Sequence, residues 1–210
     1  TLIQRRCEFL EVFEKVVEGY FGVDTAKEAV EQLKKYYFVS TADHHGPLCH
    51  PFFLNSHLVT SAMGLSNAQN ALKYIIALSC ANVSFANSSF PRGLLFHGYN
   101  NKEIKMHQLG FFPNSSAVRQ SRIFRHPAYS ISAVEKNKEK LKKMSKEGEI
   151  GDETSGCLCG ILDEIYADAK VLNCQYYSDQ ITLTNFALWS KMFKKMGVDG
   201  PKMLYIELEK

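Results

Sequence analysis

Potential metal ligands crowd into one short loop of the sequence. The segment from Val39 to His50 reads VSTADHHGPLCH and holds three of the seven histidines of the chain. Within it, Asp43, His45 and His50 supply one carboxylate and two imidazoles, which are ligand types that zinc and manganese accept. His44 is the reserve ligand, because neighbouring side chains of an extended segment point in opposite directions. We therefore predict a divalent metal ion, zinc or manganese, in this histidine loop.

Two other roles for the histidine loop stay open. In metal-free acid/base catalysis, a carboxylate would orient an imidazole whose pKa lies near neutrality. The catalytic groups would then come from Asp43, His44, His45 and His50. In a purely structural role, the imidazoles would hydrogen-bond backbone carbonyls around the turn at Gly46 and bind nothing.

The triplet Asp43-His44-His45 follows a predicted strand and resembles the Asp-His-His triplet of the DHH phosphoesterases. In that family the triplet holds manganese, so the resemblance implies a metal site at these three residues. The upstream Asp-rich segment and the downstream Gly-Gly-His of that family are not found in the sequence. The resemblance therefore covers three residues.

A second segment with binding potential is ANVSFANSSFPRG, from Ala81 to Gly93. Ser88 and Ser89 can donate hydrogen bonds to a phosphate or carboxylate, and the guanidinium of Arg92 can fork onto two of its oxygens. A polar turn before a proline is the alternative. If this segment joins two strands of the sheet that carries the histidine loop, both segments share its carboxyl edge, where α/β proteins bind ligands.

Other charged and sulfur-bearing patterns have ordinary explanations. Arg119, Arg122 and Arg125 recur at intervals of three and would form an anion clamp if they shared one helical face, but ordinary surface positions are the favoured explanation. The run from 135 to 147 alternates Lys and Glu and predicts a solvated helix. Cys157 and Cys159 are spaced too closely for a zinc ribbon and are predicted to lie in the core.

Composition narrows the class of protein. With 210 residues, 45% hydrophobic and 22% charged, the chain is predicted to form one α/β domain over 1–210, with a possible sub-boundary near 148–155. Since it begins at Thr1 without a Met, we expect a trimmed fragment of a longer chain. A net charge of +3 from 25 basic and 22 acidic residues argues against a nucleic-acid partner, and no apolar run is long enough for a membrane span.

The cysteines predict a cytoplasmic protein. Six cysteines, scattered along the chain, are too few for a disulfide framework. We therefore expect free thiols and an intracellular location. Oligomeric state leaves no signature in the sequence.

Hydrophobic periodicity predicts helices over 6–20, 25–36, 132–147, 155–170 and 178–196, and strands over 36–42, 74–85, 92–99, 102–109 and 202–210. The strand over 92–99 and the strand that follows it are expected to form a hairpin through Asn100-Asn101. Residues 52–64 are ambiguous between helix and strand, and an irregular segment or a short helix ending at Gly64 is favoured. A helix is predicted over 68–74. The alternation predicts an α/β fold with a central mixed sheet flanked by amphipathic helices.

These observations favour an enzyme, most simply a metal-dependent or histidine acid/base hydrolase that acts on a small anionic substrate. The reactive groups would lie in the histidine loop, and Ser88, Ser89 and Arg92 would hold the substrate. Hydrolysis is the reaction that such metal sites commonly serve, because the ion lowers the pKa of bound water. The alternative is a non-catalytic binding or interaction domain of a larger protein, with a structural histidine loop.

Overall fold

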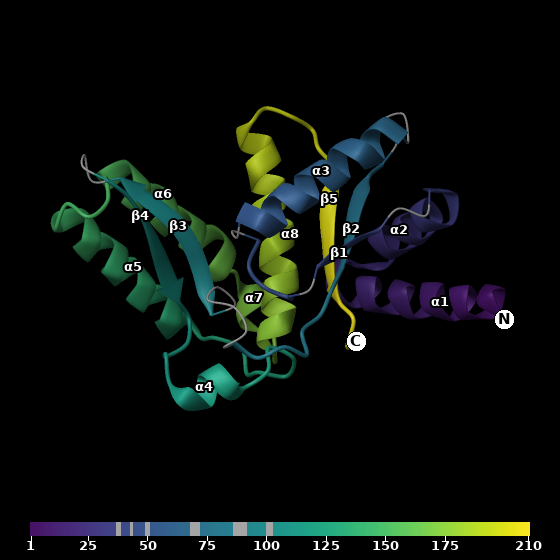
Figure 1. Ribbon diagram of the computed structural model, residues 1–210, viewed down its shortest axis with the longest axis horizontal. Coiled ribbons are helices and arrows are strands. Elements are labelled where there is room, and N and C mark those ends of the chain that lie inside the picture. Colours follow the sequence, from purple (N-terminus) through teal and green to yellow (C-terminus); the bar gives the residue numbers. More distant parts are fainter. Residues whose placement is uncertain (37–38, 43, 49–50, 68–71, 86–91, 100–102) are drawn as a thin grey trace.

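The computed structural model describes residues 1–36, 39–42, 44–48, 51–67, 72–85, 92–99 and 103–210, apart from the side chains of 51–53, 65 and 67. Figure 1 shows the arrangement of the elements. The longer helices are α1 (Leu2–Phe21), α2 (Val23–Tyr36), α3 (Pro51–Asn67), α5 (Ile131–Lys146), α6 (Asp152–Ile161) and α8 (Tyr177–Lys195). Shorter ones are α4 (Ser116–Gln120), the π-helix η2 (Leu162–Tyr166) and α7 (Ala169–Leu172).

A three-stranded parallel sheet forms the centre of the α/β part of the molecule. Its strands are β1 (Ser40–Ala42), β2 (Tyr74–Ser79) and β5 (Lys202–Glu207), in the spatial order β1-β2-β5. The register places Ala42 opposite Ser79, and Ser79 opposite Glu207. The carboxyl ends of all three strands therefore lie at one edge of the sheet.

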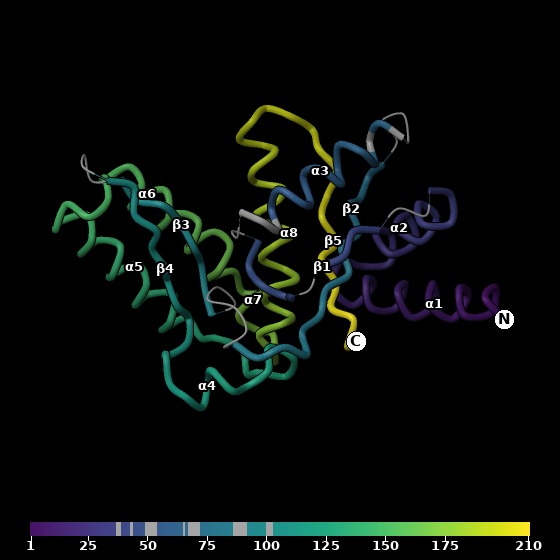
Figure 2. Tube along the Cα trace, viewed as in Figure 1, coloured from purple at the N-terminus to yellow at the C-terminus, as the bar shows by residue number. Residues whose placement is uncertain are grey.

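Both faces of this sheet are covered by helices. Tyr74 and Ile76 of β2 belong to one hydrophobic cluster with side chains of α1 and α2, whereas Ile75 and Ala77 belong to a second cluster with α8. The alternation follows from the two-residue period of a strand. Burial on both faces explains why the middle of β2, from Ile75 to Leu78, and of β5, from Met203 to Ile206, is apolar rather than alternately polar. Figure 2 shows α1 and α2 on one side of the strands and α8 on the other.

Strands β3 (Gly93–Tyr99) and β4 (Ile104–Gly110) form a separate antiparallel hairpin. Gly93 lies opposite Gly110, and a Cβ built on Gly93 would lie 1.8 Å from the carbonyl oxygen of Leu109. Helix α5 packs beside the hairpin, where Asn137 donates to the carbonyl of Gly110 at 3.2 Å. The predicted pairing of these two strands is confirmed, and its turn at residues 100–102 lies outside the described residues.

The predicted mixed α/β class is correct, but the single central mixed sheet is not. The parallel strands and the antiparallel pair are two separate sheets. Strand periodicity identifies a strand and one buried face, but says little about which strand becomes its neighbour.

The helix predictions are largely confirmed. Helix α8 ends before Gly197, whose φ of 68° is a conformation that glycine adopts readily. The ambiguous residues 52–64 lie in α3, a full helix. The helix predicted over 68–74 is wrong at its end, because Tyr74 begins β2. Among the described helices, none combines the length and apolar character needed to cross a lipid bilayer.

Candidate functional site

The histidine loop leaves β1 at the carboxyl edge of the parallel sheet, as predicted. The backbone N–H of His45 donates to the carbonyl of Cys80 at 2.8 Å, just beyond the end of β2. The imidazole of His45 is fully buried. Its Nε2 lies 2.8 Å from the carbonyl oxygen of Ser178, and its Nδ1 lies 2.7 Å from the hydroxyl of Ser79.

The electrostatics of His45 fix its protonation. Burial lowers its pKa to about 4, so the ring is neutral near pH 7. A carbonyl can only accept, so Nε2 carries the proton and donates it to Ser178, while Nδ1 accepts from Ser79. Both ring nitrogens are therefore used inside the protein, and His45 ties the loop to β2 and α8.

The predicted metal site is only partly within the described residues. Asp43 and His50 lie outside them. In the described part of the chain, no group of three His, Cys, Asp or Glu side chains is close enough together to hold a metal ion. The zinc or manganese site thus stays a prediction that depends on Asp43 and His50.

Beyond His45, the loop runs along α8 and is held there by one buried amide side chain. Asn185 donates to the carbonyl of Gly46 at 3.0 Å and accepts from the backbone N–H of Leu48 at 2.9 Å. On the preceding side, Tyr205 donates to the carbonyl of His44 at 2.6 Å. These contacts fix the path of the loop as far as Leu48.

Leu48 lines an apolar cavity of about 200 Å³. Leu94 and Leu95 of β3, which follow Arg92 closely in the sequence, line the same cavity. The remaining described lining residues come from α3, α6 and α8 and are Leu54, Leu158, Ile161, Leu188, Trp189 and Met192. The histidine loop and strand β3, which follows the serine-rich segment, therefore meet at one cavity, although β1 and β3 belong to different sheets.

His57 of α3 is a buried histidine that sequence analysis missed. Its Nδ1 lies 3.2 Å from the hydroxyl of Ser40, whereas its Nε2 has no hydrogen-bond partner among the described residues. Burial lowers its pKa to about 4. The ring of Tyr205 lies between two imidazoles, stacked on His45 at 5.2 Å and edge-on to His57 at 5.6 Å.

A helical pattern could have drawn attention to this position. His57, Ser61 and Gly64 recur at spacings of four and three and are all buried. They form the face of α3 that packs toward the sheet. Because polar and small residues make up that face, the apolar periodicity that marks most buried helix faces is absent.

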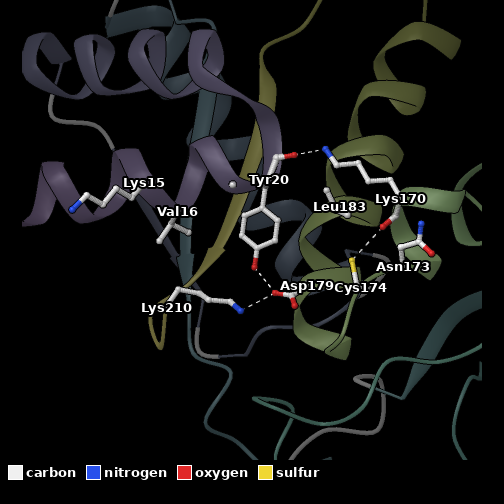
Figure 3. Close-up of a pocket in the computed structure, with 10 residues that line it drawn as sticks. Lys15, Val16, Tyr20, Lys170, Asn173, Cys174, Asp179, Leu183 and Lys210 are labelled. Atoms are coloured by element: carbon white, nitrogen blue, oxygen red, sulfur yellow. Dashed lines mark hydrogen bonds and ion pairs between the residues drawn. The ribbon is translucent and has the colours of Figure 1, made fainter.

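A polar network near the carboxyl end of β5 joins α1 to α8 (Figure 3). Tyr20 donates to Asp179 at 2.5 Å, and Lys210 pairs with Asp179 at 2.9 Å and with buried Glu207 at 3.4 Å. These residues, except Glu207, line a pocket of about 380 Å³ together with Cys174. Burial raises the pKa of the Cys174 thiol to about 11, which makes it a poor nucleophile. With its main charges paired, this network serves to hold elements together.

The serine-rich segment does not join two strands of one sheet, so that expectation is wrong. It connects β2 of the parallel sheet to β3 of the hairpin. Ser88 and Ser89 lie outside the described residues. The guanidinium of Arg92 donates to the side chain of Gln108 at 3.3 Å and lines a groove beside α5.

The three arginines at intervals of three do not share a helix. Arg119 lies in α4, which ends at Gln120. Arg122 donates to the carbonyl and side-chain oxygens of Asn82 at 2.7 and 2.9 Å, so it braces the chain after β2. Arg125 lies over the ring of Phe124. The condition for an anion clamp on one helical face is therefore not met.

The prediction of free thiols is confirmed for the cysteines among the described residues. These are Cys7, Cys80, Cys157, Cys159 and Cys174. The prediction of core positions in α6 is wrong for Cys157, which is exposed, whereas Cys159 is half-buried. The helix presents different faces at these two positions, because residues two apart point in different directions.

Comparison with protein-family models, with curated proteins and with solved structures finds no match for this chain. Function is therefore inferred from the cavity and from the segments that approach it.

Proposed function

We propose that the protein is a hydrolase whose substrate is small and carries both an anionic group and an apolar part. The observation that carries this proposal is the shared cavity, which Leu48 lines from the histidine loop and Leu94 and Leu95 line from β3. Ligand sites are typically apolar concavities with a few convergent polar groups. In this protein the polar groups would come from the histidine loop and from the serine-rich segment.

The histidine loop is proposed to supply the reactive groups. Asp43 and His50, with His44 in reserve, would hold a zinc or manganese ion or act directly as acid and base. A bound divalent ion would lower the pKa of a water molecule toward neutrality and so provide the nucleophile. We assign His45 a positioning role, because its ring nitrogens already bond to Ser79 and Ser178.

The serine-rich segment is proposed to hold the anionic group of the substrate. The hydroxyls of Ser88 and Ser89 are suitable donors for a phosphate or carboxylate, whereas Arg92 lines the separate groove beside α5 and is not assigned to this anchor. Leu94 and Leu95 follow this segment in the sequence and line the cavity, which supports a place for the two serines near the cavity rim.

The test combines elemental analysis with assays on aryl phosphates and short-chain aryl esters. Asp43→Ala and His50→Ala should abolish hydrolysis and remove any bound metal. Leu188→Phe narrows the cavity and should weaken the binding of substrates with an apolar part. Leu172→Phe is a matched control, because Leu172 is half-buried but does not line the cavity.

Hydrolysis that survives both loop substitutions would contradict the assignment of the reactive groups. If Leu188→Phe and Leu172→Phe alter KM alike, the cavity is not the substrate site. A protein without metal and without hydrolysis of any member of the panel would contradict the hydrolase proposal.

A non-catalytic binding domain is the second candidate, and one observation favours it. His45 is buried with both ring nitrogens hydrogen-bonded, as in a structural loop. Under this candidate Asp43→Ala and His50→Ala would lower the free energy of unfolding, and the parent protein would hydrolyse none of the substrates.

A further inference from the structure

A groove of about 540 Å³ runs between the β3–β4 hairpin and α5. Four cationic side chains line it, one from the start of β3 and three from α5; they are Arg92, Lys136, Lys140 and Lys143. The one carboxylate among its described lining residues is Glu139. This groove shares no described lining residue with the apolar cavity.

The three lysines of the groove lie on one face of α5, because they are spaced by four and three residues. Like charges at these spacings repel each other and destabilise a helix. Lys140 donates to the backbone carbonyl of Gln108 at 2.9 Å, and Arg92 donates to the side chain of the same residue. The two cations thus meet across Gln108, and neither of these bonds neutralises a charge.

Lys138 of the same helix has a different environment. It pairs with Asp163 at 2.6 Å and with Glu135 at 3.2 Å, on another side of the helix. In the groove, Lys143 also has a carboxylate partner, Glu147 at 3.7 Å, whereas Lys140 and Arg92 meet across the uncharged side chain and backbone of Gln108 and repel each other. An anionic ligand would relieve that repulsion.

The spacing of the charges indicates the size of the ligand. Seven residues of helix separate Lys136 from Lys143, which corresponds to about 10 Å along the axis. The ring of Phe112, which also lines the groove, is already packed against His126 at 4.5 Å and Tyr177 at 4.8 Å. Stacking of nucleic-acid bases needs an accessible aromatic ring, so this groove suits phosphate groups better than bases.

We propose that the groove between the hairpin and α5 binds a small ligand with two or more phosphate groups. The ammonium groups of Lys136, Lys140 and Lys143 would contact the phosphates from one wall, and Arg92 from the other. The proposal is independent of hydrolysis in the apolar cavity and would hold if the chain were not an enzyme.

Calorimetric titration of the full chain with inorganic tripolyphosphate tests the proposal. Lys136→Gln and Lys140→Gln should each weaken binding at least about fivefold, because each removes a charge-assisted contact. Lys138→Gln, the matched control, removes the same charge from the same helix and should change the affinity by less than about twofold. Circular dichroism on each variant verifies that α5 is intact.

Three results would overturn the proposal. One is the absence of saturable binding of tripolyphosphate at low salt. Another is an equal loss of affinity in Lys138→Gln and Lys140→Gln, which would mean that general charge attracts the anion. The third is a double-stranded oligonucleotide that binds more tightly than tripolyphosphate and loses affinity in Lys140→Gln, which would assign the groove to nucleic acid.

Discussion

Two buried imidazoles flank the ring of Tyr205, and both are held in the neutral state. His45 and His57 are both fully buried. Burial lowers the pKa of each imidazole to about 4. In the unfolded chain an imidazole titrates near pH 6.5. Between these values the unfolded state binds more protons than the folded state, so the free energy of unfolding falls as the pH falls.

This difference predicts an acid-sensitive fold. On going from about pH 7.5 to about pH 5, each of the two histidines should lower the free energy of unfolding by about 2 kcal/mol. Replacing His57 by Gln should remove about half of that combined loss, as measured by urea unfolding at both pH values. His97→Gln is the control, because His97 is exposed. An unchanged pH dependence in His57→Gln would contradict the prediction.

Asn185 carries a second prediction at the scale of single residues. Asn185→Ala would leave the carbonyl of Gly46 and the N–H of Leu48 without their side-chain partner. Such buried polar groups cost about 1–3 kcal/mol each when unsatisfied, so we expect a loss of about 2–4 kcal/mol in the free energy of unfolding. Asn114→Ala, at an exposed position, should have little effect. Chemical denaturation of both variants measures the difference.

The hairpin shows how one element depends on a single glycine. A Cβ on Gly93 would meet the carbonyl oxygen of Leu109, a backbone atom that cannot turn aside. Gly93→Ala should therefore force the strands apart and lower the free energy of unfolding by at least about 2 kcal/mol. Gly156→Ala is the matched control within helix α6, where a Cβ has nothing within 4 Å. That change should stabilise the protein by about 0.5–1 kcal/mol, and a similar loss in both variants would contradict the argument.

Elements with strong periodicity were predictable from the sequence, and their partners were not. Helix α5 and strands β3 and β4 follow local patterns of charge and apolar residues. Helix α3 escaped prediction because His57 and Ser61 occupy its buried face. In the candidate site, sequence reasoning found the histidine loop, but the bonds of His45 to Ser79 and Ser178 depend on segments far away in the chain.

At the scale of the whole molecule, noncovalent packing holds the described parts together. The larger hydrophobic cluster contains side chains from the parallel sheet, the hairpin and α8, among them Ile75, Leu94 and Trp189. The described cysteines form no disulfide with one another. The two sheets are thus joined through a common core rather than by hydrogen-bonded strands.

This arrangement predicts that reducing agents leave the fold unchanged. Thiol counting on denatured, unreduced protein should give at least the five free cysteines of the described residues. Thermal unfolding with and without dithiothreitol should give the same midpoint. A count of two or fewer would mean that at least three of these five thiols are not free, which would contradict the assignment.

The contacts that fix the histidine loop also set the order in which it can form. His45 bonds to a residue 133 positions later, and Gly46 to one 139 positions later. Strand β5, at the far end of the sequence, completes the sheet beside β2. On a translating ribosome the loop is made before α8, and until α8 has emerged it can dock only against the end of β2. The loop can therefore complete its contacts, and the cavity can close, only after α8 has been made.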